Sequence, residues 1–452
     1  MSDYSLQVVN NRELPPRIPA QLVELEGNYN FKPYIAELPD GEILMSLSHT
    51  HAEEAVTGGT LTVHPVTYRS PDGGRTWGDG RHVPEMVGAH EPAVTVIDGV
   101  VFVTTHFGKP PRNDPIAGRD YLYNVIYRSE DAGRTFEALD ITAEFLGDPE
   151  EDQSESTRNL LRLHDGRIIL GVDCGMRSYI LSSDDHGKTW KSRRIEYDGV
   201  SWEGAGRSCL MAESVLFFSP SGRLMMLARL DYTQVRFDRD LPHLPDYHRK
   251  TGLDQFDGEV LFEADDDLTR WRPLRALGFP ALMYPSIVDL AGPRQLFTFT
   301  VREIPPAGTG SVYPKVGVQA AFVEEQADGF MDFRLAEDLV IIDDSTPASQ
   351  RNAGCFGNTI MTAKGTLVTP YSFPKIDEEI LRLADDRAYL DPVVFNRYAE
   401  MQNTYSFRYE DFVQDDKELM EMMLRRCFSA LFLYAQCANK GGIGTRVVRW
   451  RV

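Results

Sequence analysis

Short apolar runs of strand length recur along this chain, and tight turns join them in pairs. In Ile35–Leu44, for example, Asp40-Gly41 separates two apolar segments. Asp-Gly between hydrophobic runs is typical of a β-hairpin, because both turn residues accept positive φ. Six such hairpins are predicted, the last two less regular in sequence: Ile35–Leu44, Ala93–Phe102, Leu160–Ile169, Val215–Leu224, Ile287–Leu296 and Ile360–Val368.

Each hairpin is followed by a further pair of apolar runs, so the chain is expected to be all-β and to form four-stranded units. Repeats of roughly 55–75 residues with this content favour a six-bladed β-propeller spanning residues 1–452 as a single domain. The ring would close through Ser429–Ala435 and Thr445–Trp450, with Leu6–Val9 pairing nearby to join the first and last blades. A seven-bladed ring is the alternative if the N-terminal segment contributes more than one strand.

The hydrophobic pattern changes after Tyr371. Glu378–Ala384 and Lys417–Leu424 place apolar residues at i, i+3 and i+4. This spacing predicts amphipathic helices. We therefore expect a helical insertion over residues 372–427, within the last blade.

Three copies of one motif, S-x-D-x-G-x-T-[WF], interrupt the strand pattern at Ser70–Trp77, Ser129–Phe136 and Ser183–Trp190. A fourth, degenerate copy is Ala264–Trp271. Ser and Asp side chains can bond nearby backbone N–H groups, and Gly accepts positive φ, so each copy is expected to form a turn between strands. The motif resembles the Asp-box, or bacterial neuraminidase repeat, of the sialidase-like β-propellers. The resemblance implies that fold, with the motif on the outer rim and away from the chemistry.

Composition narrows the possible partners. A formal net charge of −21 argues against non-specific binding to nucleic acid or docking on an anionic membrane. No apolar run approaches the ~18 residues of a membrane span, and the first residues lack the pattern of a signal peptide. Five cysteines without close pairing favour a reduced, cytoplasmic protein with buried thiols; a secreted protein lacking its signal peptide would look the same. Oligomeric state is left open.

The first strand of each propeller blade lines the central channel, so residues just upstream of each hairpin are candidates for chemistry. These are Lys32, Tyr34, His90, Glu91, Thr157, Arg158, Glu213, Tyr284 and Asn358, and the ends of the second strands add His49, His51, His106 and Arg229. Charged and aromatic groups converging on one axis suit an acidic oligosaccharide or glycan. Glu213 opens an apolar strand and would be costly to bury unpaired, so a partner such as Arg229 is expected.

Sialidases, which this chain resembles, use a tyrosine nucleophile relayed by a glutamate, an aspartate acid/base and three arginines that bind the substrate carboxylate. Glu213 and Arg229 look like the glutamate and one arginine, and Lys32 falls in register with the leading arginine of an R-I-P motif. Arg17-Ile-Pro19 spells that motif but lies upstream of the first hairpin. Phe356 stands at the expected tyrosine, and no aspartate precedes the first Asp-box. The comparison implies a sialidase fold with different chemistry.

Histidine is suited to proton transfer near neutral pH, and a hairpin would bring His90 and His106 to the same face of blade two. Two histidines with an arginine and a tyrosine resemble the propeller polysaccharide lyases, such as rhamnosyl-glucuronate lyases. In these, an Arg or Lys neutralises a uronate carboxylate while His or Tyr moves the C5 proton. Either histidine could instead be an ordinary residue at a strand end.

The preferred hypothesis is therefore β-elimination at a uronate, with His90 and His106 as proton-transfer groups. Glu213 is the third catalytic candidate, and the substrate-binding candidates are Lys32, Tyr34, Arg158, Arg229, Tyr284 and Asn358. A retaining exo-glycosidase that uses Glu213 is the nearest alternative, and a non-catalytic glycan- or protein-binding propeller is the third. We expect no cofactor and no metal, because nothing fixes the geometry of a His49/His51/His90 site.

Overall fold

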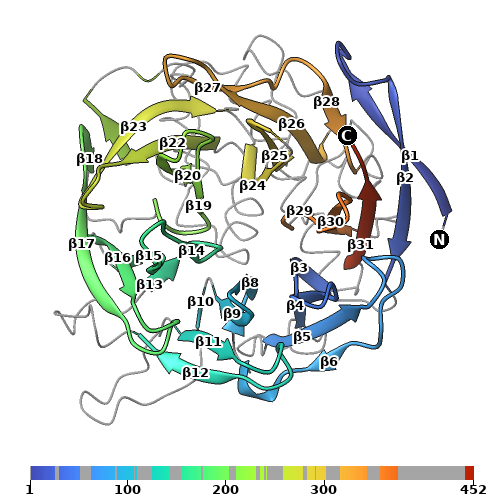
Figure 1. Ribbon diagram of the computed structural model, residues 1–452, viewed down its shortest axis with the longest axis horizontal. Helices are drawn as coiled ribbons and strands as arrows, with labels where there is room; N and C mark the ends of the chain where they lie inside the picture. Colours follow the sequence, from blue (N-terminus) through green and yellow to red (C-terminus); the bar gives the residue numbers. More distant parts are fainter. Residues whose placement is uncertain are drawn as a thin grey trace, which may run out of the picture.

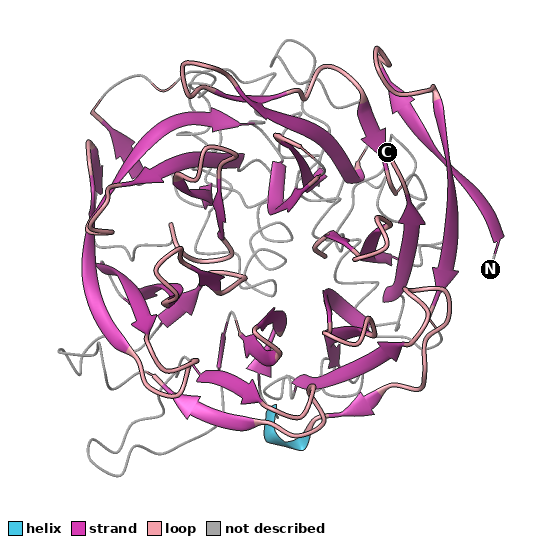
Figure 2. Ribbon diagram, viewed as in Figure 1, coloured by secondary structure: helices cyan, strands magenta, loops and turns pink. Residues whose placement is uncertain are grey.

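The structure is a computed structural model. It describes residues 2–25, 30–50, 63–86, 89–105, 107–108, 125–141, 154–174, 177–202, 210–230, 235–238, 241, 258–277, 282–290, 292–301, 316–343, 357–374 and 443–452. Within these ranges the secondary structure is almost entirely strand, with one 3₁₀ turn at Pro84–Met86 (Figure 2). None of the helices in these ranges has the length and apolar character needed to cross a bilayer.

Antiparallel strands form groups arranged around a central axis (Figure 1). The first group runs outward from the axis through β3 (Asn30–Glu37), β4 (Ile43–Thr50), β5 (Val63–Ser70) and β6 (Arg81–His82). The second contains β8 (Ala93–Ile97), β9 (Val100–Thr104), β11 (Val125–Ser129) and β12 (Glu137–Asp140). Beside it, β7 (Ala89–His90) pairs with β10 (Phe107–Gly108).

The next two groups repeat this order. The third contains β13 (Ser154–Ser156) and β14 (Leu161–Arg162), both paired with β15 (Ile168–Cys174), then β16 (Arg177–Ser183) and β17 (Lys191–Tyr197). The fourth contains β19 (Val215–Phe218), β20 (Leu224–Leu230), β22 (Gly258–Ala264) and β23 (Arg270–Leu277). A short pair, β18 (Val200–Trp202) with β21 (Val235–Phe237), lies near them.

The fifth group consists of β24 (Leu282–Asp289), β25 (Arg294–Val301) and β26 (Gly317–Glu325), with β27 (Met331–Phe333) and β28 (Leu339–Ile341) both paired to β26. The sixth consists of β29 (Ile360–Met361), β30 (Leu367–Pro374) and β31 (Ile443–Trp450). All six predicted hairpins are present as the two innermost strands of these groups.

The N-terminal segment joins the two ends of the ring. β2 (Arg17–Glu24) pairs with β31 as the outermost strand of the sixth group, and β1 (Ser2–Val9) pairs with both β2 and β28. Leu6–Val9 therefore lies beside the fifth group, and the strand that completes the last group is β2, which the sequence analysis had not identified. The N-terminal segment thus contributes two strands, both of which extend existing sheets, and the seven-bladed alternative stays a prediction.

The β-propeller fold is thus confirmed. Grouped around their hairpins, the described strands form six sets, although the pairing of β17 with β23 joins the third set to the fourth, and β1 with β2 joins the fifth to the sixth. The blade count of the whole chain stays a prediction. The last described strand before residue 443 runs to Pro374, just past the expected start of the helical insertion, and the rest of that insertion lies outside the described residues, as does Ser429–Ala435. Cys174 is buried as expected, whereas the other four cysteines lie outside the described ranges.

The three repeated turns have one hydrogen-bond pattern. In the first, Ser70 Oγ accepts from Gly74 N, and Asp72 Oδ1 accepts from Arg75 N and Thr76 N, both at 2.9 Å. The other two copies repeat these contacts through Asp131 and Asp185. In the degenerate copy, Asp265 accepts from Thr269 N and Arg270 N.

These turns also join neighbouring groups, through an arginine of the preceding one. Arg449 Nε donates to the Gly73 carbonyl at 2.6 Å, and Arg128 Nε donates to the His186 carbonyl at 3.0 Å. Arg69 donates in the same way to the Ala132 carbonyl. Packing between groups is apolar, as in the cluster that contains Leu227, Phe297 and Ile341. Consecutive groups are therefore joined both by arginine hydrogen bonds and by apolar packing.

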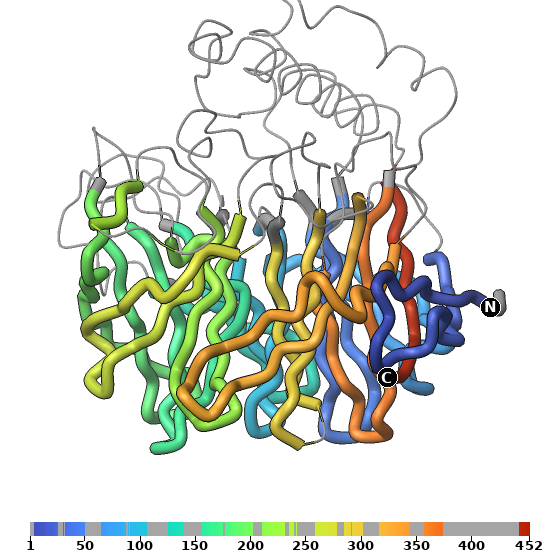
Figure 3. Tube along the Cα trace, turned by 90° about the horizontal axis from the view of Figure 1, so that it is seen from above, coloured from blue at the N-terminus to red at the C-terminus, as the bar shows by residue number. Residues whose placement is uncertain are grey.

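The ring has two faces, and the strands run from one face to the other, as the side view shows (Figure 3). The innermost strand of each group runs from one face to its Asp-Gly-type hairpin turn at the other face. Because the strands alternate in direction, the repeated turns after the third strand lie at that same second face. Residues at the start of each innermost strand therefore gather at the first face, around the axis.

Candidate functional site

One residue from each group occupies an equivalent position at the start of the innermost strand. In chain order these residues are Lys32, Glu91, Arg158, Glu213, Tyr284 and Gly357. The first five place a charged or aromatic side chain near the axis. At the sixth, no side chain fits, because a Cβ at residue 357 would lie 1.9 Å from the Pro370 carbonyl oxygen.

Four of these residues have an unusual backbone conformation. Lys32, Glu91, Glu213 and Tyr284 have φ angles of 52° to 56°. This left-handed region costs a non-glycine residue of order 1–3 kcal/mol, and such strain concentrates at functional sites. The pairing register shifts at Lys32 and at Tyr284, so each lies at an irregularity where its strand departs from the ladder. The repeated bend turns these side chains toward the axis.

Buried serines hold two of these bends. Lys32 N donates to Ser372 Oγ, and Glu91 N donates to Ser48 Oγ, both at 2.9 Å. Ser48 lies on β4 of the first group and Ser372 on β30 of the sixth, so in each case one group positions the charged residue of the next. Elsewhere, Arg158 N donates to the Ser214 carbonyl at 2.8 Å.

The charged side chains form one ion-pair cluster, which we call the axial cluster: Lys32, Glu91, Arg158, Glu213 and Arg229. Glu213 contacts all three cations, with Lys32 Nζ at 3.1 Å from its Oε1. Glu91 contacts Lys32 and Arg158. The predicted partnership of Glu213 with Arg229 is confirmed.

Every member of the axial cluster is buried. The exposed fraction ranges from 2% for Glu213 to 9% for Glu91. Buried charges are tolerated only when they are paired and hydrogen-bonded, which the cluster achieves. Three cations against two carboxylates leave these five side chains with one net positive charge, in a chain whose total charge is −21.

Tyr284 packs against this cluster. Its ring centroid lies 5.0 Å from Lys32 Nζ, 5.7 Å from Arg158 Cζ and 5.5 Å from Arg229 Cζ. Its hydroxyl lies 3.3 Å from Arg229 Nη1, the nitrogen that also contacts Glu213. Tyr284 therefore contacts all three cations of the axial cluster, through its ring or its hydroxyl.

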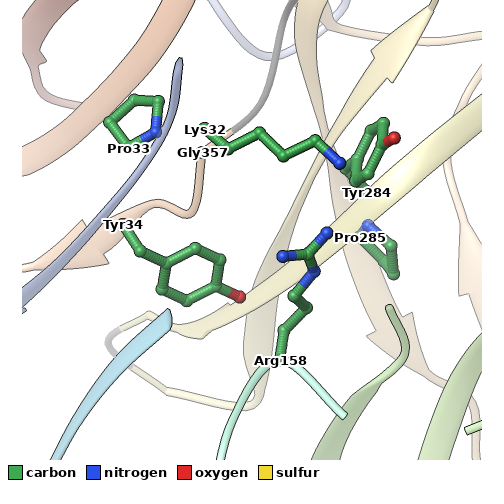
Figure 4. A pocket seen from close by; sticks show the side chains of 7 residues that line it. All are labelled: Lys32, Pro33, Tyr34, Arg158, Tyr284, Pro285 and Gly357. Carbon is green, nitrogen blue, oxygen red and sulfur yellow. The ribbon is translucent and has the colours of Figure 1, made fainter. Parts of the chain in front are cut away.

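A small cavity of about 10 Å³ opens beside these groups, room for about one water molecule. It is lined by Lys32, Pro33, Tyr34, Arg158, Tyr284, Pro285 and Gly357 (Figure 4). The Tyr34 hydroxyl points toward the Arg158 guanidinium in this view. Burial raises the pKa of Tyr34 to about 12, against the opposing effect of Arg158, so Tyr34 is a neutral hydroxyl at pH 7.

The structure brings six predicted residues together: Lys32, Tyr34, Arg158, Glu213, Arg229 and Tyr284. Their roles toward a substrate stay predictions. Asn358 has a different contact, since its amide bonds both the N–H and the carbonyl of Ile35, at 2.7 and 2.8 Å. That pair joins the sixth group to the first in the manner of a strand ladder. The observed role of Asn358 is therefore structural, and its contact with a substrate stays a prediction.

Of the two predicted catalytic histidines, His90 and His106, the structure describes only the backbone of His90. The backbone of His90 pairs with Phe107, the residue after His106, so the expected approach of these segments is present in the backbone. His106 lies outside the described residues, and so does the side chain of His90. Their proposed proton transfer stays a prediction. Within the described ranges, no group of three or more His, Cys, Asp or Glu side chains is arranged to hold a metal ion.

Three residues that build the site are absent from the catalytic and substrate-binding residues predicted from the sequence. Glu91 lies upstream of a hairpin, but the histidine chemistry of its neighbour His90 favoured that residue instead. The equivalence of Glu91 in position to Glu213 was the available signal. Ser48 and Ser372 carried no signal, because one serine in a strand looks like any other until the neighbouring group is in place.

Comparisons with known proteins agree with this fold. No family model matches the chain. A sialidase from Micromonospora viridifaciens is 28% identical over 251 residues, which is 48% of this chain and 38% of that protein. The chain thus matches well under half the length of this curated relative.

Three solved structures show the same fold. A protein of unknown function from Dyadobacter fermentans has a TM-score of 0.52 at 15% identity, covering 82% of this chain and 94% of that one. The NanB sialidase from Streptococcus pneumoniae has a TM-score of 0.50 at 14% identity, covering 81% and 69%. The intramolecular trans-sialidase from Ruminococcus gnavus, in complex with oseltamivir carboxylate, has a TM-score of 0.50 at 11% identity. The match covers 76% of this chain and 90% of that one.

Proposed function

We propose that this chain is a member of the sialidase-like β-propeller superfamily and a glycan-processing enzyme that acts on a terminal acidic sugar. The observation that carries the proposal is Arg229 Nη1, which contacts both the Tyr284 hydroxyl and the Glu213 carboxylate. The relatives named as sialidases support glycan processing, and so does the resemblance of the three repeated turns to Asp-boxes.

In this proposal, the cations of the axial cluster bind the anionic sugar. Lys32 and Arg158 are held between the carboxylates of Glu91 and Glu213, and a substrate carboxylate competes with Glu91 for both cations. Arg–carboxylate pairs in a buried site are strong and directional. The described cavity admits about one water, so the substrate carboxylate enters by displacing a side chain of the cluster.

The proposed reaction is retaining glycosyl transfer through Tyr284. The phenolic oxygen loses its proton to water and bonds the anomeric carbon as the bond from that carbon to the leaving oxygen breaks. The leaving oxygen takes a proton from water, and a second water then cleaves the glycosyl-tyrosine, which releases the sugar and restores the tyrosine hydroxyl. Arg229 stabilises the charge that develops on the phenolic oxygen, and Glu213 orients Arg229 through the same nitrogen. Tyr284 thus provides the hydroxyl that Phe356 lacks. We assign no general acid among the described residues.

β-Elimination at a uronate is the second candidate, and the pairing of His90 with Phe107 favours it. In that reaction a base removes the C5 proton, the bond from C4 to the leaving oxygen breaks, and a C4=C5 double bond forms. Lys32 and Arg158 would neutralise the carboxylate and lower the barrier to proton removal. His90 and His106 would transfer the protons.

The two reactions differ in their products. The enzyme would be incubated with sialyl-lactose, gum arabic, ulvan and pectic fragments, with released sugar and absorbance near ~235 nm followed together. Sugar release without absorbance supports glycosyl transfer. Rising absorbance supports elimination and rejects the preferred reaction. Binding without any turnover would support a non-catalytic propeller.

Variants test the role of Tyr284. Tyr284→Phe should lower kcat/KM by at least about 100-fold, because the reacting oxygen is removed. Tyr197→Phe is the matched control, since that phenol donates to Ser178 Oγ on the outer strands, and it should retain wild-type activity. If Tyr284→Phe keeps more than a tenth of the activity, Tyr284 is not the nucleophile.

A further inference from the structure

A second cleft lies on the opposite face of the ring from the axial cluster, between the sixth and first groups. It has a volume of about 560 Å³ and is lined in part by Ile18, Gln21, Arg75, Thr366, Arg449 and Arg451. We call it the rim cleft. Ile18 and Pro19 belong to the R-I-P sequence near the N-terminus, so that sequence lies here and not at the axis. Its volume is in the range of small-ligand sites.

Three arginines converge on the rim cleft, and each is oriented by neutral oxygens. Arg449 Nε donates to the Gly73 carbonyl at 2.6 Å, and its Nη1 donates to Gln21. Arg451 donates through Nε and Nη2 to Thr366 Oγ1, both at 3.2 Å. Arg75 Nη1 donates to the Asp72 carbonyl at 3.1 Å. These contacts hold the guanidinium groups in place without neutralising their charge.

The arginines are close enough to repel one another. Burial, together with the charges of Arg75 and Arg451, lowers the pKa of Arg449, and Asp72 opposes this effect only in part. The Asp72 carboxylate accepts from Arg75 N, Thr76 N and Thr76 Oγ1 within its own turn. Three arginines and one aspartate give the rim cleft two net positive charges in a chain of charge −21.

We propose that the rim cleft is a binding site for an oxyanion carried by a ligand of about disaccharide size. Guanidinium groups bind carboxylate, sulfate and phosphate oxygens through paired N–H donors. The three arginines supply donors from the end of β31 and from the repeated turn of the first group, so the anion bridges two neighbouring groups. This site is separate from the axial cluster, and the proposal does not depend on the reaction at the axis.

Isothermal titration calorimetry with inorganic sulfate, inorganic phosphate and digalacturonate tests the site and separates the possible sources of the anion. Arg75→Gln and Arg451→Gln should each weaken binding of the preferred probe about tenfold. Arg134→Gln is the matched control, because Arg134 Nη1 makes the same 3.1 Å contact with the Asp131 carbonyl in the second repeated turn. It should bind like the wild type.

Three results would overturn the proposal. The first is that none of the three probes binds the wild-type protein at millimolar concentration. The second is that Arg75→Gln binds as tightly as Arg134→Gln. The third is that Arg158→Met at the axis abolishes binding while Arg75→Gln does not. In that last case the anion binds at the axial cluster alone. Selective binding of sulfate or phosphate supports a sulfated or phosphorylated ligand, and selective binding of digalacturonate supports a uronate.

Discussion

At the scale of single residues, the axial cluster shows how buried charge is tolerated. Glu213 is 2% exposed and contacts three cations, while Arg158 contacts both carboxylates. Each side chain depends on the others, because an ion left unpaired in a buried site keeps its full desolvation cost. Removing one member is therefore expected to cost more than removing a balanced pair.

Arg158→Met should lower the free energy of unfolding by about 3–5 kcal/mol, since Glu91 and Glu213 each lose a buried partner. The double variant Arg158→Met/Glu213→Gln should recover part of this loss. Urea unfolding at pH 7 measures both. Arg162→Met is the control from the same group, because its pair with Asp98 is about half exposed and should contribute less than about 1 kcal/mol. Equal losses for Arg158→Met and Arg162→Met would contradict the coupling.

At the scale of elements, the repeated turns are held by aspartates that accept several hydrogen bonds. The N–H of Thr135, with smaller contributions from Ser129 and Arg134, holds the pKa of Asp131 well below its usual range. Asp185 is held low in the same way, first by Thr189. A lowered folded-state pKa stabilises the protein above the unfolded pKa, near ~3.9, and this stabilisation is lost as the pH falls toward the folded value.

Asp131→Asn should therefore flatten the acid limb of the stability curve. At pH 7 the variant loses about 1 kcal/mol, because a charged acceptor is replaced by a neutral one. Between pH 4 and about pH 2, the melting temperature of the wild type should fall further than that of the variant. Asp266→Asn is the control, an exposed aspartate for which the described residues show no hydrogen bond to a turn amide. Parallel acid limbs for Asp131→Asn and the wild type would refute the assignment.

At the scale of the whole molecule, the N-terminal hairpin links the fifth and sixth groups. Leu6 on β1 is 0% exposed and packs in a cluster with Ile18, Val340 and Trp450, which come from both groups. The ring is therefore closed by residues from opposite ends of the chain. Loss of this contact should weaken the whole ring, since each group is stabilised by its neighbours.

Leu6→Ala should lower the free energy of unfolding by about 2–5 kcal/mol, as expected for a fully buried leucine. Circular dichroism and tryptophan fluorescence should report one shared transition at a lower denaturant midpoint. Gln7→Ala, one residue along the same strand and on its other face, should leave the midpoint nearly unchanged. An unaltered midpoint for Leu6→Ala would mean that the hairpin is a local attachment and does not hold the ring closed.

Much of the architecture could be predicted because its signals are local. Asp40-Gly41 marks a hairpin within ten residues of chain, and Ser70, Asp72 and Gly74 build a turn from their own side chains. The gathering of Lys32, Arg158 and Glu213 at the axis followed from their shared position before each hairpin. The closing strand β2 was not found, because Pro19 breaks its strand pattern and its partner β31 lies more than 400 residues away.

The sequence by itself determined the strands, the turns, the all-β class and the set of polar residues near the axis, because these depend on neighbouring residues and on the period of the repeat. Tertiary structure alone decided that Glu91 shares the axial cluster, that Ser48 and Ser372 hold its bends, and that Asn358 bonds Ile35. It also decided that Arg75 meets Arg449 and Arg451 in the rim cleft. Each of these contacts joins distant segments, and only the closed ring brings such segments within hydrogen-bond distance.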